Sequence, residues 1–162
     1  MKTRDFMTFT VRGVEPAPQG SKRHVGKGVM VESSKKVAPF RKAVADAVFR
    51  EWTLTEDSRP FTEPVIVQAT FYVPKPPSVR RLLPSVAPDA DKLCRSLGDG
   101  LSINAQALAD DALIVGWRVS KLYAAFPEDM GVRVTIRTVQ NAMDYYGFVT
   151  FEEMLHWLEK HD

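Results

Sequence analysis

Two pairs of aspartates are the residues in this chain most able to do chemistry. Asp89 and Asp91 lie two residues apart, and Asp110 and Asp111 follow as an adjacent pair further along the chain. Carboxylates placed this densely repel one another, and a bound cation relieves that repulsion. Hard oxygen ligands of this kind suit Mg²⁺ or Mn²⁺. The pattern therefore predicts a divalent metal site with carboxylate ligands.

A metal at such a site would act on negatively charged substrates. It lowers the pKa of bound water and stabilises charge that develops on a phosphodiester. The alternative for Asp91 is a simple helix N-cap, a position at which Asp is favoured. The second acidic pair argues against capping alone, because two acidic clusters on either side of one expected helix need a further reason to coexist.

The segment from about Asp91 to Leu101 has the apolar spacing of a helix. Its charged side carries Asp91, Arg95 and Asp99, four residues apart in turn. Arg95 either forms an ion pair with Asp91 or contacts a phosphate, and the sequence leaves both open. Asp99 is expected to support or cap the site rather than bind the metal. The apolar side is expected to bury Leu93, Cys94, Leu97 and Leu101, with no reactive thiol.

The elements that must position these residues indicate an α+β fold. Alternating apolar residues predict four strands, and helical spacing predicts a helix that begins near Pro39. The expected strands are residues 6–13, 64–73, 112–122 and 132–139, the last two as partners. A long loop is expected over 74–88, and a weak hairpin over 24–32. We expect a small mixed β-sheet with helices on one side.

The C-terminal part is expected to form a separate helical extension. Thr150 and Glu153 have the spacing of a capping box at a helix start. The expected division is therefore a main domain over 1–142 and an extension over 143–162. The apolar stripe of that helix either packs on the protein itself or docks a partner protein; it consists of Phe151, Met154, Leu155 and Leu158.

Composition narrows the class of protein further. The chain has 162 residues, enough for one domain with a real core. Its apolar runs are too short to span a membrane, and its start lacks signal-peptide character. Cys94 is the only cysteine, which suits a reducing cytoplasm and excludes an internal disulfide. One Cys and three His are too few for a structural zinc site. The chain has no glycine-rich phosphate loop, and no organic cofactor is expected.

Charge is unevenly distributed along the chain. Residues 1–50 carry eleven Lys/Arg and four Asp/Glu, a net charge of +7, whereas 51–100 sum to −1 and 101–162 to −4. A basic region beside an acidic cluster fits a polyanion such as nucleic acid, although solvated surface charge is the alternative. The candidate phosphate contacts in two loops are Lys22, Arg23, Arg80 and Arg81.

Three segments together resemble the RusA family of Holliday junction resolvases, small endodeoxyribonucleases of bacteriophages and prophages. These segments are Asp89–Leu101, Asp110–Val115 and Val119–Lys121. The family pattern reads roughly Asp-x-Asp-Asn-x-x-Lys-x-x-x-Asp-x-Leu, then Asp-Asp-x-x-Val, then a strand that ends in Lys. The similarity covers roughly residues 6–139.

The resemblance implies a metal-dependent nuclease that cuts branched DNA. Asp89, Asp91 and Asp111 would be the Mg²⁺ ligands, with Asp110 as an auxiliary and Mn²⁺ as a substitute metal. A homodimer would nick two opposing strands of a four-way junction, in a bacterial host cytoplasm if the chain is phage-encoded. The family's catalytic Lys falls on Arg95, which keeps the charge but cannot donate a proton in the same way.

Two further lysines are implied in DNA binding. Lys92 stands where the family has Asn, and Lys121 ends the strand. About ten residues of strand would separate Lys121 from Asp111 by roughly 33 Å, so we expect Lys121 to bind DNA away from the metal or across a dimer. The alternative functions are a non-catalytic protein that binds branched DNA and a nuclease that acts mainly on forks or flaps.

Overall fold

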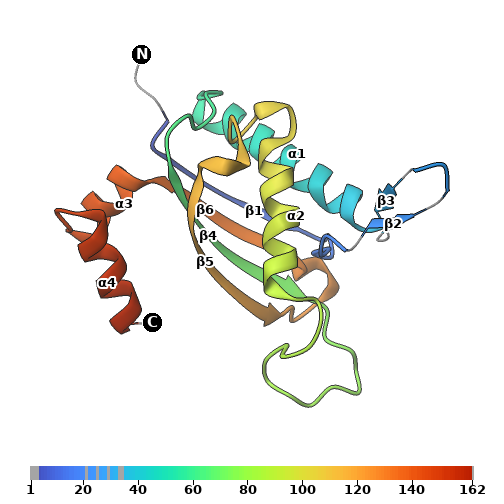
Figure 1. Cartoon of the computed structure of the whole chain (residues 1–162). Helices are drawn as coiled ribbons and strands as arrows, with labels where there is room; N and C mark the ends of the chain where they lie inside the picture. The colour runs from blue at the N-terminus through green and yellow to red at the C-terminus, as the bar shows by residue number, and fades with distance from the viewer. Residues whose placement is uncertain (1–3, 21, 25, 29, 33–34, 162) are drawn as a thin grey trace.

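A computed structural model describes residues 4–20, 22–24, 26–28, 30–32 and 35–161. Its centre is a four-stranded sheet with strand order β1-β6-β4-β5 (Figure 1). Strand β4 pairs in parallel with β5 and antiparallel with β6, which in turn pairs antiparallel with β1. The strands are β1 Phe6–Arg12, β4 Val65–Val73, β5 Ile114–Tyr123 and β6 Gly131–Thr138. The expected α+β fold with a mixed sheet is confirmed.

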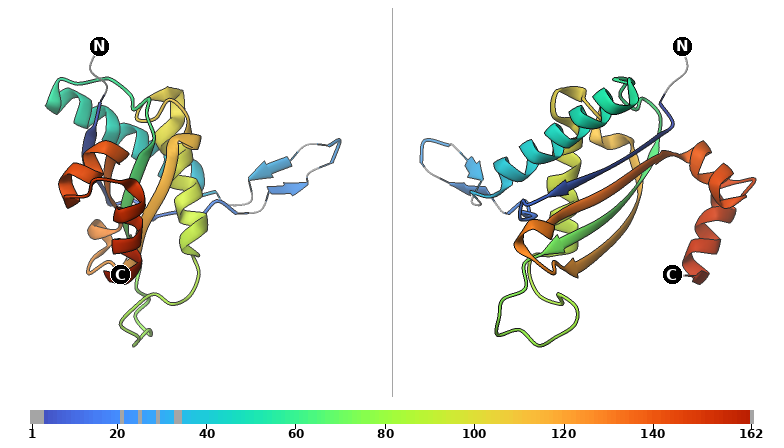
Figure 2. Two further views of the ribbon diagram at one scale, coloured as in Figure 1. Left: turned by 60° about the vertical axis from the view of Figure 1, so that its left-hand side comes forward. Right: turned by 180° about the vertical axis from the view of Figure 1, so that it is seen from behind.

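Two helices cover one face of this sheet, as Figure 2 shows. Helix α1 spans Val37–Thr55 and helix α2 spans Ala90–Ser102. Both elements were expected, since each has apolar residues at helical spacing that turn towards the sheet. The helices and the inward-facing residues of the strands form one apolar core. Its fully buried members from α2 and β4 include Leu93, Leu97, Leu101, Val65, Val67 and Phe71.

The remaining elements surround this core. A hairpin of β2 (Lys22–His24) and β3 (Met30–Glu32) projects beside the start of α1 (Figure 1). Short 3-10 helices follow at η1 (Ile103–Ala105), η2 (Asp111–Leu113) and η3 (Pro127–Asp129). None of the described helices combines the length and apolar character needed to cross a bilayer.

Two C-terminal helices lie beyond the end of β6. They are α3 (Val139–Tyr146) and α4 (Phe151–His161), so the boundary expected at residue 143 falls inside α3. The expected capping box at α4 is present, because Thr150 Oγ1 accepts from the Glu153 amide at 3.1 Å and Glu153 Oε2 accepts from the Thr150 amide at 3.2 Å. In the stripe of α4, Met154 is buried, whereas Leu155 is 41% exposed.

The expected pairing of the strands near 112–122 and 132–139 is wrong. Strand β4 lies between them and pairs with both. The physical reason is the connection through α2: a parallel pair requires a crossover, and a helix that packs on the sheet provides one. The chain leaves β4, crosses the face as α2 and returns as β5, which becomes an edge strand of the sheet.

A β-bulge at the start of β5 changes which side chains face the helices. Val65 pairs with Ile114, but its neighbour Ile66 pairs with Gly116, which leaves Val115 as the extra residue. A bulge reverses the alternation of side chains at that point. Ile114 and Trp117 therefore share the helix side. The single face expected for Leu113, Val115, Trp117 and Val119 is not formed, since Val115 is 51% exposed.

Replacing each of two glycines in α2 with alanine is expected to change the stability of the protein in opposite directions. A Cβ on Gly100 would lie 3.1 Å from Cβ of the buried Val44, whereas a Cβ on Gly98 would make only ordinary contacts. Alanine is favoured over glycine inside helices by about 1 kcal/mol. We expect Gly98→Ala to raise the free energy of unfolding by about 0.5–1 kcal/mol and Gly100→Ala to lower it by about 1–3 kcal/mol. Chemical denaturation measures both, and equal effects would contradict the close crossing of α1 and α2.

Candidate functional site

A cleft of about 600 Å³ opens between α2 and β5. Its helix wall carries Asp91, Arg95 and Asp99, as expected from their spacing. Its other wall comes from η2 and the helix-facing side of β5. That wall holds Asp111, Ile114, Trp117 and Val119. The structure therefore places one residue from each predicted acidic pair, and Arg95, in the lining of the same cleft.

The orientation of α2 follows from the burial of its leucines. Leu93, Leu97 and Leu101 are fully buried, and residues on the opposite side of a helix must then face outward. This places the Asp91–Arg95–Asp99 row at the cleft. Burial of the leucines thus positions the charged side chains of Asp91, Arg95 and Asp99, which are not themselves part of the apolar core.

Helix α2 runs antiparallel to β5 (Figure 1). A Cβ on Gly98, in the second half of α2, would lie 3.7 Å from Cδ1 of Ile114 at the start of β5. At the other end, Lys121 contacts the residues that precede α2. Asp111 therefore enters the cleft near the later turns of α2, and Asp91 enters it from the first turn.

The other two aspartates have local partners. Asp89 is the N-cap residue of α2, and its Oδ2 lies 3.4 Å from Nζ of Lys92. Asp110 Oδ1 accepts from the Ala112 amide at 2.8 Å and so caps η2. In the described part of the chain, no three Asp, Glu, His or Cys side chains lie close enough to hold a metal ion together. The compact three- or four-carboxylate group is not formed in this structure.

Arg95 is exposed at the cleft. The expected alternative of an ion pair with Asp91 is not found among the described residues, where the closest ion pair on this helix row is between Asp99 and Arg41. An arginine without a carboxylate partner keeps its donors available for an anion. The geometry thus favours the second of the two roles left open for Arg95.

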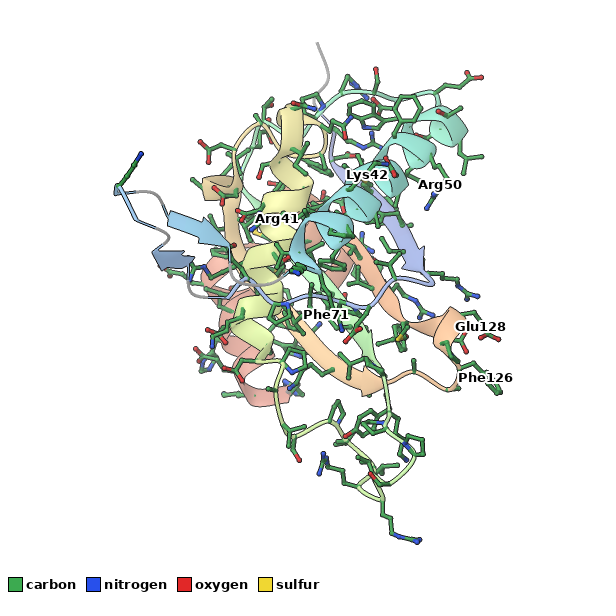
Figure 3. The ribbon with its side chains drawn as sticks, turned by 90° about the vertical axis from the view of Figure 1, so that its right-hand side faces the viewer. Arg41, Lys42, Arg50, Phe71, Phe126 and Glu128 are labelled. Atoms are coloured by element: carbon green, nitrogen blue, oxygen red, sulfur yellow. The ribbon has the colours of Figure 1, made fainter. Side chains whose placement is uncertain are left out.

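Asp99 proves to be part of the cleft rather than a cap. Its Oδ2 accepts from Nη2 of Arg41 at 2.8 Å. Arg41 comes from α1, and Figure 3 shows it where α1 meets α2. Sequence reasoning missed Arg41, because 58 residues separate it from Asp99. The sequence did indicate that Asp99 lies on the same side of the helix as Asp91, and this position could have suggested that Asp99 also faces the cleft.

Lys121 contacts the segment that leads into Asp89, a contact that its expected distance from Asp111 did not reveal. Its Nζ donates to the carbonyl oxygens of Val86 at 3.0 Å and Pro88 at 2.8 Å. Pro88 directly precedes Asp89, so Lys121 ties the loop to β5 just before the start of α2. The prediction from the sequence considered only the distance between Lys121 and Asp111, and it treated residues 111–121 as one continuous strand. Lys121 is instead at the Asp89 end of the site.

The surroundings of Cys94 make its thiol unreactive. Burial and the nearby charge of Asp91 together raise its pKa to about 11, so the nucleophilic thiolate is scarce at neutral pH. Cys94 was expected in the core, and it lies at the core's edge, where it also lines the cleft.

Three of the predicted basic contacts are exposed, two on the loop before α2 and one on α2 itself. Arg80 and Arg81 are exposed on the 74–88 loop, and Arg81 Nε donates to the Tyr123 hydroxyl at 2.9 Å. Lys92 is exposed on α2. The side chains of Lys22 and Arg23 lie outside the described part of the structure, although their backbone belongs to β2.

The loop after β1 approaches the cleft. Gln19 lines the cleft, and its amide donates to the Lys92 carbonyl at 3.1 Å. This bond carries the Pro-rich segment, and the hairpin that follows it, to the side of α2. The segment that leads to the β2–β3 hairpin therefore passes beside the cleft.

Comparison with known proteins identifies the class. A model of the family described as endodeoxyribonuclease RusA matches residues 13–137, which is more than half of the chain. The match identifies the chain as a DNA nuclease of this fold. The chain belongs to the RusA family, whose members act on branched DNA junctions. No curated protein matches it. The resemblance drawn from the aspartate spacing is confirmed, and α3 and α4 lie beyond the matched residues.

The Lys121 bonds predict a local loss of order when they are removed. We expect Lys121→Met to lower the free energy of unfolding by about 1–3 kcal/mol, because hydrogen bonds to a charged group are lost. Amide hydrogen exchange should become faster in the 79–90 segment. Arg95→Met is the matched control, since it removes an exposed charge from the same cleft region. Equal exchange in the two variants would show that Lys121 does not hold the loop.

Proposed function

We propose that this protein is a divalent metal-dependent endodeoxyribonuclease that resolves four-way junctions and related branched DNA by paired nicks. The observation that carries the proposal is that Asp91, Asp111 and Arg95 line one open cleft. Family membership supports the nuclease reaction and the branched substrate. The metal, the paired nicks and the preference for four-way junctions are the parts that we propose.

The residues of the cleft fit Mg²⁺ or Mn²⁺. Both Asp91 and Asp111 are exposed, and carboxylate oxygens are hard ligands. Mg²⁺ is commonly held by one or two carboxylates, with waters and substrate phosphates filling the other positions. Asp91 and Asp111 would hold it here, and Asp89 and Asp110 stand next to them in sequence as auxiliary ligands. When bound, such a metal supplies an activated water and stabilises charge on the phosphodiester.

Arg95 would bind the phosphate that is cut. A guanidinium presents several donors in a fixed plane and can hold two phosphate oxygens at once. Its proposed contribution is charge stabilisation and positioning. The proton for the leaving oxygen must then come from water or another group. Arg95 is the point at which this chain departs from the lysine of its family.

The neighbours of these residues would keep them in place. Arg41 neutralises part of the charge of Asp99 through its 2.8 Å contact, which lowers the repulsion along the helix row. Lys121 fixes the peptide that leads into Asp89. The ring of Trp117, 36% exposed in the cleft, forms an apolar wall against which a sugar or base can pack.

Paired nicks require two active sites. The acidic cleft described here is built from one chain, so a homodimer would supply the second site and allow cuts in two opposing strands. A four-way junction has two-fold symmetry to match such a dimer. Light scattering in solution measures the oligomeric state directly, and a strictly monomeric enzyme that still makes paired cuts would contradict this part of the proposal.

Removal of either cleft carboxylate should abolish cleavage while DNA binding remains. We expect Asp91→Asn and Asp111→Asn each to slow single-turnover cleavage of a four-way junction by at least about 100-fold, as for loss of one electrostatic group from a catalytic site. Asp46→Asn is the matched control, because Asp46 is an exposed aspartate that pairs with Lys42 on α1. Chelation of Mg²⁺ should stop the wild-type reaction.

The same assay separates the alternatives. A panel of four-way junctions, forks and flaps with mapped cut sites gives the preferred substrate. Cleavage by Asp91→Asn at the wild-type rate would contradict the metal mechanism. Tight binding of junctions with no product in Mg²⁺ or Mn²⁺ would instead identify a non-catalytic binding protein.

A further inference from the structure

The face of the sheet opposite α1 and α2 is open. Figure 2, in the view from behind, shows the four strands uncovered on that side, with α3 and α4 set beside one end of the sheet. We call this the open sheet face, and define it by the strand residues that alternate with the buried ones. They are Phe6, Thr8, Thr10, Arg12, Ile66, Gln68, Thr70, Tyr72, Gly116, Arg118, Ser120, Leu122, Arg133, Thr135 and Arg137.

The strand positions of the open sheet face include basic residues and no acidic ones. Its four charged strand residues are all arginines, and no Asp or Glu occupies any of its strand positions. A random share of this chain's charges would include acids, because its Asp/Glu total is 20 against 22 Lys/Arg. The charge therefore points to an anionic partner. The arginines are Arg12, Arg118, Arg133 and Arg137.

The polar residues are aligned across all four strands. Arg133 pairs with Thr10 on one side and with Thr70 on the other, and Thr70 pairs with Ser120. The next row is Thr8, Thr135, Gln68 and Arg118. Neighbouring strands are about 4.8 Å apart, so each row spans roughly 14 Å. Hydroxyl, amide and guanidinium donors of this kind bind phosphate oxygens.

The face is also hollowed at β4 and β5. A depression of about 500 Å³ there is lined in part by Gln68, Thr70, Arg118 and Ser120. The guanidinium of Arg137 lies at the other end of the face, 4.7 Å from the ring centre of Phe6 and 4.0 Å from that of Tyr145. Aromatic rings hold this cation in place without neutralising its charge.

A second copy of the chain is a poor occupant for this face. A two-fold contact would bring the same arginine-bearing surface against itself, and like charges opposite one another are destabilising. The large apolar residues that are exposed there are Phe6, at 40%, and Leu122, at 38%, and they lie towards opposite ends of the strands. Charge and polarity favour a phosphate backbone instead.

We propose that the open sheet face is a second DNA-binding surface, which holds the phosphodiester backbone of a duplex arm on the opposite side of the sheet from the cleft. This binding does not depend on cleavage, because none of the cleft aspartates belongs to the face. A branched DNA has several arms. The cleft would act at the branch while this face holds one arm of the same molecule.

The test compares two exposed arginines on opposite sides of the protein. Arg133→Glu changes the open sheet face, and Arg50→Glu makes the same charge change on α1. The probe is an unbranched DNA duplex in the presence of chelator, with binding followed by fluorescence anisotropy at several salt concentrations. We expect Arg133→Glu to weaken binding by about 10-fold or more and to reduce the slope of log Kd against log salt by about 1.

Arg50→Glu should change the affinity by less than about 2-fold, since surface charges far from the bound phosphates are largely screened. Equal affinities for the two variants would overturn the proposal. A change in mass of Arg133→Glu by light scattering would overturn it as well, because the face would then be an interface between copies. The cleavage mechanism is tested separately by Asp91→Asn, so either proposal can fail alone.

Discussion

The packing of α2 against the sheet is the interaction on which the rest of the structure depends. Leu93, Leu97 and Leu101 are fully buried between the helix and the strands. At about 25 cal/mol per Å² of buried apolar surface, each such leucine contributes roughly 2 kcal/mol. The same burial fixes the rotation of the helix, so that its charged row must face the cleft. Stability and site geometry are therefore set by one apolar stripe.

The crossover that contains α2 also explains the two-sided character of the protein. A helix between two parallel strands covers one face of the sheet and leaves the other to its own residues. On the covered side the structure gathers carboxylates around a cleft. On the open side it presents arginines and hydroxyls. Acidic groups suit the divalent metal that we propose for the cleft, and basic groups suit DNA, which is a polyanion.

Much of this arrangement could be predicted from local sequence patterns. The strand and helix periods were visible, and the spacing of Asp91, Arg95 and Asp99 placed them on one side of a helix. The rest depended on non-local geometry. The bulge at Val115 is a matter of strand register, and the contact between Arg41 and Asp99 joins residues far apart in the chain. The contact between Lys121 and the segment before Asp89 was missed, because distance along a strand does not show what packs beside its end.

The central claim is that Asp91 and Asp111 act on one metal ion in one cleft. A double-mutant cycle on single-turnover junction cleavage in Mg²⁺ tests it most directly. If the two carboxylates hold the same ion, the double variant Asp91→Asn/Asp111→Asn should be about as slow as the slower single variant, because groups that act as a unit are strongly non-additive. Independent effects that multiply in the double variant would contradict the shared metal site.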